Sequence, residues 1–210
     1  LLAAGIKCCW RLTTVSPSYL DELSHSANGL ESLMRDERGK STGILNGIDT
    51  QVWDPATDEM LEKKYTIKNV VAGKKANKEA LCELFQLDSA KPLICFIGRL
   101  VGDKGADLLP EIIRRSLSEN DNQHSYIILG SGDPHIEWEL QNLKNNYSAN
   151  CNVYIGYNEK IAHQIYAGSD FLLMPSRVEP CGLNQLYSLR YGTVPIVRSV
   201  GGLKDTVIDF

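Results

Sequence analysis

Residues 170–199 read DFLLMPSRVEPCGLNQLYSLRYGTVPIVRS, and the order of their patterns decides the fold. Short, continuous apolar runs at 170–176 and 193–199 are typical of β-strands that are buried on both faces of a sheet. Between these runs, Glu179 and Pro180 lead through two small residues into a segment of helical character. A strand, a turn, a helix and a second strand in this order predict one repeating unit of a parallel sheet.

The same alternation extends toward the N-terminus as far as residue 92. Three further apolar runs are predicted strands, at 92–98, 125–130 and 152–157. Three amphipathic segments are predicted helices, at 106–119, 135–146 and 160–168. Asp133 followed by Pro134 is typical of a helix start. We therefore predict an α/β fold, a parallel sheet with helices on both faces, that binds ligands at the carboxyl ends of its strands.

The N-terminal part of the chain shows a less regular pattern. Residues 11–28 predict a strand, a turn and a helix that begins at about Tyr19. Residues 77–87 predict a further helix. Asn-Gly and Asp-Pro turn signals between these helices indicate a domain boundary near 41–58.

The composition is that of an ordinary folded protein. Of 210 residues, 43% are hydrophobic and 23% are charged, and a net charge of −4 gives no basic excess for binding nucleic acid. No apolar run approaches the ~18 residues that a membrane-spanning helix needs. The six cysteines form no C-x-x-C pair and the four histidines are scattered. We therefore predict no metal site, and reduced thiols in a cytoplasmic protein.

The loop that follows the strand at 92–98 carries two cations. Arg99 and Lys104 flank a turn that begins at Gly98, where the missing side chain lets backbone approach a ligand closely. A helix that starts near Gly105 would point its N-terminal amides at the same place, which suits an anion such as a diphosphate. The alternative is that both cations are solvated beside a helix end. The loop matches neither the G-x-x-x-x-G-K-[ST] nor the G-x-G-x-x-G motif, which argues against a P-loop NTPase and an ordinary nicotinamide enzyme.

The loop that follows the strand at 170–176 carries one acid, Glu179. Pro180 stiffens the turn, and residues 181–183 open a helix whose first N–H groups lack partners within the helix. A carboxylate beside those donors can accept hydrogen bonds from sugar hydroxyls while the amides bind phosphate oxygens. A solvated loop acid is the alternative. Tyr157, at the end of another strand, either stacks on a nucleobase or lies at the rim of a site.

Four stretches closely resemble bacterial glycogen synthase and plant starch synthase: ILNGIDTQVWDP, GRLVGDKGADLL, GSGDP and the run from 155 to 207. The resemblance covers nearly the whole chain and is strongest from 92 to 207. It implies the GT-B architecture, in which two Rossmann-like domains face each other across a cleft. It also implies that glucose passes, with retention of configuration, from a nucleotide-glucose, usually ADP-glucose, to the non-reducing end of an α-1,4-glucan. No cofactor and no metal are expected.

The resemblance assigns roles to matching positions. Arg99 and Lys104 match the cations that bind the diphosphate, and Glu179 matches the essential acid near the transferred glucose. The expected nucleotide-sugar contacts are Asn46, Gly98, Tyr157, Cys181, Gly182, Leu183 and Asn184. Related retaining transferases carry a second glutamate at the position of Tyr187. We therefore expect no pair of acid and nucleophile, and no covalent glycosyl-enzyme.

The resemblance also implies how the chain is divided. Residues 1–41 are expected to be the tail of an N-terminal catalytic domain, 42–58 the interdomain linker, and 59–210 a C-terminal nucleotide-sugar-binding domain that is truncated at its end. With the rest of the N-terminal domain absent, we expect the isolated chain to be inactive. The alternatives are a catalytically silent module that binds nucleotide or glucan, and another GT-B transferase of the sucrose- or trehalose-synthase type. The choice between ADP-glucose and UDP-glucose stays open.

Overall fold

The computed structural model describes residues 1–209, and its centre is a five-stranded parallel sheet in the order β5-β4-β3-β6-β7. The strands are β3 (Leu93–Ile97), β4 (Ser125–Gly130), β5 (Cys151–Ile155), β6 (Phe171–Met174) and β7 (Val194–Val197). Neighbouring strands pair in parallel register, so that Cys95 of β3 lies between Ile127 of β4 and Leu172 of β6. The predicted α/β fold with a parallel sheet is confirmed.

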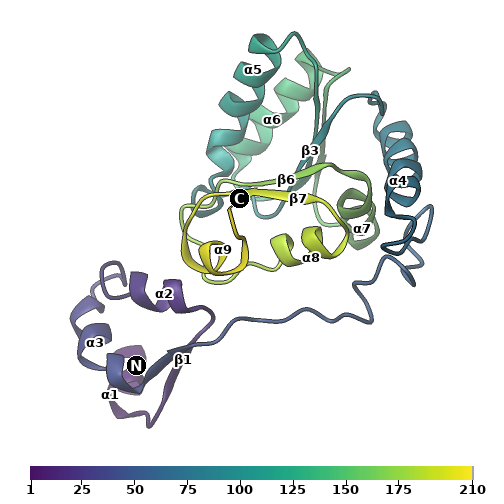
Figure 1. Ribbon diagram of the computed structural model, residues 1–210. Helices are drawn as coiled ribbons and strands as arrows, with labels where there is room; N and C mark the ends of the chain where they lie inside the picture. The colour runs from purple at the N-terminus through teal and green to yellow at the C-terminus, as the bar shows by residue number, and fades with distance from the viewer. Residues whose placement is uncertain (210) are drawn as a thin grey trace.

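Helices cover both faces of this sheet (Figure 1). They are α4 (Val70–Phe85), α5 (Leu109–Glu119), α6 (Pro134–Asn146), α7 (Glu159–Gly168), α8 (Asn184–Arg190) and α9 (Gly201–Thr206). Because side chains alternate between the two faces along a strand, Cys95 and Ile127 pack in one core with α4 and α7. Phe96 and Ile128 pack in a second core with α5 and α6. The sheet is therefore buried on both faces, which explains its continuous apolar runs.

The loop after β3 differs from the prediction. Helix α5 begins only at Leu109, after 3₁₀ turns at Gly102–Lys104 and Ala106–Leu108. Gly105 separates the two turns in a left-handed conformation with φ of +67°, and a Cβ there would lie 2.3 Å from the Pro175 carbonyl oxygen. The expected helix N-terminus near Gly105 is therefore wrong, because close packing against the loop after β6 requires a turn at this position.

Helix α4 begins earlier than the helix predicted at 77–87. It includes Gly73, a residue type that disfavours helix interiors. A Cβ at Gly73 would lie 2.2 Å from the Tyr65 Cβ, so packing requires glycine at this position. The helix therefore includes Gly73 despite the low helix propensity of glycine. Most predicted strands also extend one or two residues past the observed ends, where the chain turns into loops.

Residues 1–43 form a small unit that contains α1 (Leu2–Cys8), β1 (Leu12–Thr14), α2 (Pro17–Glu22), α3 (Glu31–Asp36) and β2 (Ser41–Gly43). Strands β1 and β2 pair in parallel. The core of the unit consists of Ile6, Leu20 and Met34. The predicted order of strand, turn and helix in 11–28 is confirmed. The helix begins at Pro17 because the Ser16 hydroxyl accepts from the Tyr19 N–H at 3.1 Å and caps its first turn.

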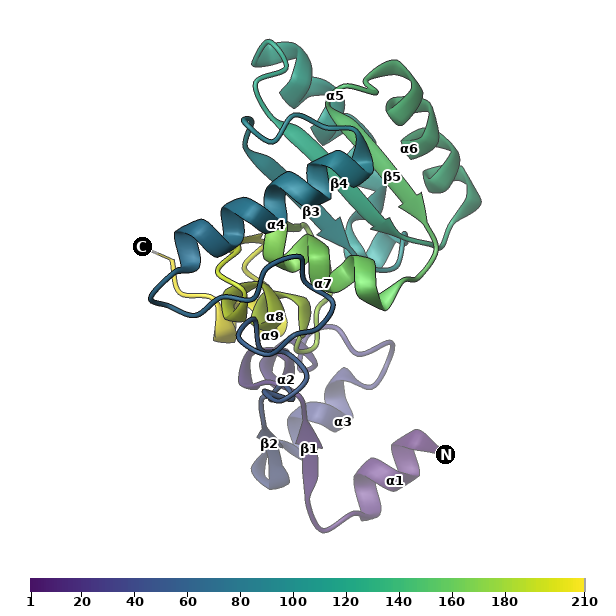
Figure 2. The ribbon, with the colours of Figure 1, turned by 90° about the vertical axis from the view of Figure 1, so that its right-hand side faces the viewer.

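An extended segment connects this unit to the sheet (Figure 1), and residues 44–49 belong to no helix or strand. Helix α2 nevertheless lies beside α9 (Figure 2), where the Ser18 N–H and hydroxyl donate to the Asp205 carboxylate at 2.8 and 2.6 Å. The predicted domain boundaries stay a prediction.

Across the described residues, no helix combines the length and apolarity needed to cross a membrane. The cytoplasmic location stays a prediction.

Candidate active site

The strand order reverses at β3, because the chain passes from β3 to β4 on one side and later returns to β6 on the other. In such sheets, ligands bind beyond the carboxyl ends of the strands that flank the reversal. A hollow of about 90 Å³ lies there, between the loop after β3 and the loop after β6. Its lining includes Gly98, Lys104, Ser176, Glu179, Gly182 and Asn184.

A lysine and a glutamate meet at this hollow although 75 positions separate them in the sequence. The Lys104 Nζ lies 2.7 Å from Glu179 Oε1 and 2.6 Å from Oε2, and the Ser176 hydroxyl donates to Oε2 at 3.1 Å. Glu179 is only 5% exposed, and a carboxylate at that depth requires charged and hydrogen-bonded partners. The structure thus brings Lys104 and Glu179 together, while the catalytic roles assigned to them stay predictions.

Three glycines shape the turn that carries the acid. Gly182 has a φ of +78°, and the Gln185 amide fills the space beside it, donating to two carbonyls of the turn at 2.9 and 3.0 Å. The Gly202 N–H donates to the Glu179 carbonyl at 2.9 Å, and a Cβ at Gly201 would lie 2.1 Å from the same oxygen. Gly201 and Gly202 therefore let α9 pack directly against the backbone of Glu179.

A second ion pair joins the loops on the two sides of the hollow. The Arg177 guanidinium contacts the two carboxylate oxygens of Asp107 at 2.5 and 2.8 Å and donates to the Gly102 carbonyl at 2.7 Å. This bidentate hydrogen bonding lowers the pKa of the Asp107 carboxyl and raises the pKa of Arg177. The sequence alone does not predict this pair, because its members lie 70 positions apart and neither has a distinctive local pattern.

Helix α8 is joined to the central strand at its first residue. The Asn184 Nδ2 donates to the carbonyl of Ile97, the last residue of β3, at 2.6 Å. Leu183, the N-cap residue, forms no side-chain cap, so no side chain at that position occupies the first N–H groups of α8. Asn184 therefore fixes the position of the turn against β3, a contact that the sequence alone does not indicate.

Four other predicted site residues, Arg99, Tyr157, Asn46 and Cys181, do not line the hollow. The Arg99 side chain is exposed and, within residues 1–209, forms neither a hydrogen bond nor an ion pair. Tyr157 is 82% exposed beyond the end of β5, and Asn46 is exposed in the extended segment. Cys181 is buried in the turn without lining the hollow. Arg99 is absent from the lining of the hollow, and the ligand contacts predicted for all the site residues stay predictions.

Behind α8, an aromatic cluster fixes the end of the extended segment. Trp53 stacks between His163 and Tyr187, with ring centroids 3.9 and 3.8 Å away. Beneath it, the His163 Nδ1 and the Tyr191 hydroxyl contact Asp58 Oδ2 at 2.7 and 2.6 Å. Tyr187 therefore takes part in packing, and the described lining of the hollow contains a single carboxylate. No group of three or more His, Cys, Asp or Glu side chains that could hold a metal ion occurs in the described part of the chain.

Comparison with known proteins gives matches over the whole chain. Residues 85–210 match the family described as Glycosyl transferases group 1, and residues 1–36 match the family described as Starch synthase catalytic domain. A glycogen synthase of Flavobacterium johnsoniae is 60% identical over 209 residues, which cover 100% of this chain and 44% of the relative. A glycogen synthase of Hydrogenovibrio crunogenus is 44% identical, again over 100% of this chain and 44% of the relative. The chain thus spans less than half the length of the curated relatives it matches.

Solved structures agree with these matches. The catalytic domain of starch synthase IV from Arabidopsis thaliana, bound to ADP and acarbose, has a TM-score of 0.91 and 38% identity, and the match covers 99% of this chain and 43% of that chain. The Anabaena protein HepE in complex with UDP-glucose has a TM-score of 0.68 at 15% identity, over 98% of this chain and 49% of that chain. The second likeness concerns the fold alone. The resemblance predicted from the sequence is confirmed.

Proposed function

This chain belongs to the glycosyl transferases group 1 family, and from that premise we propose that it forms the nucleotide-sugar-binding part of a glucan synthase. The enzyme transfers glucose from ADP-glucose to the non-reducing end of an α-1,4-glucan and retains the anomeric configuration. Two findings support the proposal: curated relatives at 60% and 44% identity carry the name glycogen synthase, and the starch synthase from Arabidopsis thaliana was solved with ADP and acarbose.

The observation that carries the proposal is the Lys104–Glu179 pair at the reversal of strand order. A diphosphate that enters the hollow competes for the Lys104 ammonium through charge-assisted hydrogen bonds, which releases the Glu179 carboxylate to accept from glucose hydroxyls. The side-chain exposures support this order, because Lys104 is 24% exposed and Glu179 only 6%, so that a ligand reaches the lysine first.

The transfer exchanges one bond at the anomeric carbon for another. The bond to the diphosphate oxygen breaks, and the diphosphate leaves with the electron pair. The oxygen of the acceptor hydroxyl bonds to the same face of the carbon and loses its proton, and the leaving oxygen on that face is positioned to take it. Lys104 and Arg99 stabilise the negative charge of the leaving group, whereas Glu179 stabilises the positive charge that develops on the sugar.

The single carboxylate of the hollow argues against a covalent intermediate. A retaining glycosidase forms a glycosyl-enzyme with two carboxyl groups that are about 5 Å apart. Among the described lining residues, Glu179 is the one acid, and Tyr187 packs on Trp53. The proposed reaction therefore proceeds without a bond between glucose and the protein.

The experiment that tests this function measures glucose transfer by the full-length protein that contains this chain. ADP release and glucan elongation are followed for the wild type and for Glu179→Gln. Loss of the charge that stabilises the transition state lowers kcat by about 10²–10³-fold. Glu83→Gln, which changes an exposed acid on α4, is the matched control and keeps the wild-type rate. Equal rates for Glu179→Gln and the wild type contradict the proposal.

Two further readouts separate the alternatives. A kcat/KM that is higher with ADP-glucose than with UDP-glucose supports ADP-glucose as the donor. The reverse order contradicts that donor but is compatible with the proposed type of reaction. Nucleotide or glucan binding without turnover by the full-length wild type contradicts the synthase and favours a catalytically silent binding module.

A further inference from the structure

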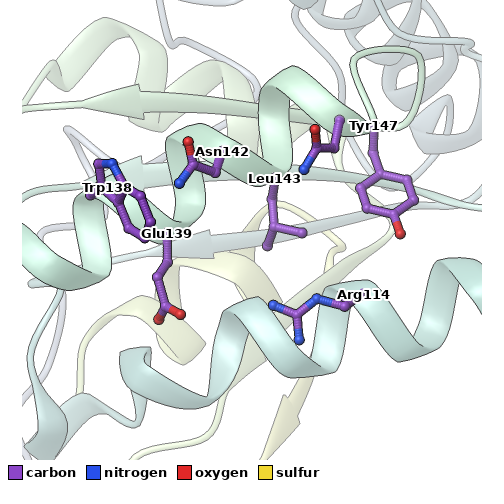
Figure 3. Close-up of a pocket in the computed structure, with 7 residues that line it drawn as sticks. Arg114, Trp138, Glu139, Asn142, Leu143 and Tyr147 are labelled. Atoms are coloured by element: carbon purple, nitrogen blue, oxygen red, sulfur yellow. The ribbon is translucent and has the colours of Figure 1, made fainter.

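A second hollow, of about 450 Å³, lies on the outside of the sheet unit between α5 and α6 (Figure 3). Its polar and aromatic lining consists of Arg114, Trp138, Glu139, Asn142, Asn146 and Tyr147. None of these residues lines the hollow of Lys104 and Glu179, and the proposed transfer uses none of them. We call this feature the α5–α6 hollow.

Trp138 presents a large apolar ring to solvent in this hollow. Helix α6 packs on the sheet through Ile136, Leu140 and Leu143, whereas Trp138 is 62% exposed. The His135 ring lies 6.2 Å away at an interplanar angle of 42°, so it does not stack on the indole. An exposed indole, with an apolar face and an N–H donor, is typical of binding surfaces. Its face is available to the flat apolar side of a ligand ring.

Polar side chains follow the ring along the same side of α6. Asn142 and Asn146 come at four-residue spacing after Trp138, and Tyr147 follows directly. In residues 1–209, the side chains of Asn142, Asn146 and Tyr147 form no hydrogen bond with another protein group. Two amides and one hydroxyl therefore supply both donors and acceptors for a ligand that has both.

The charges of the α5–α6 hollow balance. Arg114 contributes one positive charge and also pairs with Glu111, and Glu139 contributes one negative charge and lies 3.7 Å from His135. This balance gives no field that favours an anion such as a nucleic acid, and the unpaired amides disfavour a wholly apolar ligand. A neutral ring with hydroxyl groups and an apolar C–H face has the matching chemistry, which is the chemistry of a sugar.

The row of side chains is longer than one sugar ring. Trp138 and Asn146 are eight residues apart on α6, which corresponds to about 12 Å of helix, and Tyr147 follows at the end of α6. We propose that the α5–α6 hollow is a second binding site for an α-glucan chain, in which Trp138 stacks on a glucose ring and the amides and hydroxyl bond its hydroxyls. The inference rests on the proposed function, because the acceptor polymer supplies the chain. A chain held there raises the effective concentration of its other ends at the reaction site.

Glycogen binding by the full-length protein tests this inference, measured by affinity electrophoresis in gels that contain glycogen and by calorimetry with maltoheptaose. Loss of the stacking ring in Trp138→Ala weakens glycogen binding about tenfold. Asn142→Ala weakens it by a smaller factor. Trp10→Ala removes another exposed tryptophan, which is 88% exposed and lies in the N-terminal unit, and leaves glycogen binding unchanged.

Kinetics distinguish this site from the reaction site. Trp138→Ala raises the KM for glycogen and leaves kcat with maltotriose as acceptor at the wild-type value. Equal glycogen binding by the wild type, Trp138→Ala and Asn142→Ala, in a protein that transfers glucose normally, overturns the second site and leaves the proposed function standing. Glycogen binding that depends on Trp138 in a wild type without transferase activity supports the second site and overturns the proposed function. Capture of a protein partner through Trp138, with no effect of the substitution on glycogen, also overturns the glucan assignment.

Discussion

Two lysines of this chain contact groups of oxygen atoms, which are carboxylate oxygens at one lysine and backbone carbonyl and hydroxyl oxygens at the other. Lys104 lines the hollow between the loops after β3 and β6 and donates to both carboxylate oxygens of Glu179. Lys74, on α4, donates to three backbone carbonyls outside α4 at 3.0, 3.3 and 3.5 Å and to the Thr193 hydroxyl at 2.8 Å. Burial lowers the pKa of the Lys74 ammonium to about 8.

A ligand can replace the partner of one lysine and not of the other. The carboxylate of Glu179 is a side chain, so an anionic ligand in the hollow can take over the Lys104 ammonium. The carbonyls around Lys74 belong to the backbone of packed elements, and their positions are fixed. We therefore expect Lys104, whose partner is exchangeable, to bind a ligand, and Lys74, whose partners are fixed, to join elements of the fold.

The largest expected effect separates the two lysines by activity. Lys104→Ala lowers kcat of the full-length protein by about 10²–10³-fold, because the leaving diphosphate loses a cation that stabilises its charge. Lys74→Met keeps the wild-type kcat under conditions in which circular dichroism confirms that both variants are folded. The comparison fails if ADP release is equally slow in both variants, or if Lys104→Ala matches the wild type.

A backbone change beneath the acid has the next largest effect. Gly201→Ala adds a Cβ that would lie 2.1 Å from the Glu179 carbonyl oxygen, at a residue with φ of +44°. The turn must move, and displacement of a catalytic group by about 1 Å lowers kcat by about 10²-fold. Gly39→Ala is the control, since a Cβ there meets no atom within 4 Å. Equal activity of the two variants would show that the position of the Glu179 turn does not matter.

The second ion pair has a smaller expected effect. Arg177→Ala removes the side-chain contacts between the loop after β3 and the loop after β6, while the Arg177 and Val178 N–H groups still donate to the Asp103 carbonyl. It lowers kcat about tenfold, which corresponds to about 1.4 kcal/mol of activation free energy. Both side chains of the pair are partly exposed, at 40% and 41%, so the free energy of unfolding falls by less than about 1 kcal/mol. Asp107→Asn and the double variant complete a cycle. Additive losses in kcat would contradict a shared role for the pair.

Lys74 has the smallest effect on activity and a distinct signature in stability. Its pKa is about 8 in the folded protein against an ordinary value of 10.5, so between these pH values the unfolded chain binds more protons. The free energy of unfolding therefore rises with pH across this window, by up to about 3 kcal/mol. Urea unfolding isolates the effect. The free energy of unfolding of the wild type minus that of Lys74→Met rises from about pH 8 to about pH 10. A difference that stays constant or falls contradicts the buried, charged state of Lys74.

Much of the fold follows from local patterns in the sequence. The continuous apolar runs predict buried parallel strands, and Asp133, whose side chain accepts from the His135 N–H at 2.8 Å, caps α6 as its Asp-Pro pattern predicts. The start of α4 and the turn at Gly105 could not be predicted in this way. Both depend on how closely another part of the chain packs, Tyr65 eight positions before Gly73 in the first case and Pro175 seventy positions after Gly105 in the second.

The candidate site likewise contains residues that local patterns predict and contacts that only the folded chain creates. Lys104 and Glu179 could be predicted because each follows a strand, and the ends of parallel strands meet at one edge of a sheet. The Arg177–Asp107 pair, the Asn184 contact with Ile97 and the Trp53 stack each join segments far apart in the chain. A single sequence contains no local signal for such contacts. Arg99 has the same local signal as Lys104, yet its side chain is exposed and does not line the hollow.

The affinity of the full-length protein for ADP tests the central claim most directly. Calorimetry with ADP compares the wild type with Lys104→Met and Lys74→Met, two substitutions that remove the same charge from similar side chains. A charge-assisted hydrogen bond between Lys104 and the diphosphate predicts that Lys104→Met raises the Kd for ADP at least about tenfold, whereas Lys74→Met leaves it unchanged. An unchanged Kd in Lys104→Met would contradict the account, because the cation at the reversal of strand order would then take no part in binding the nucleotide.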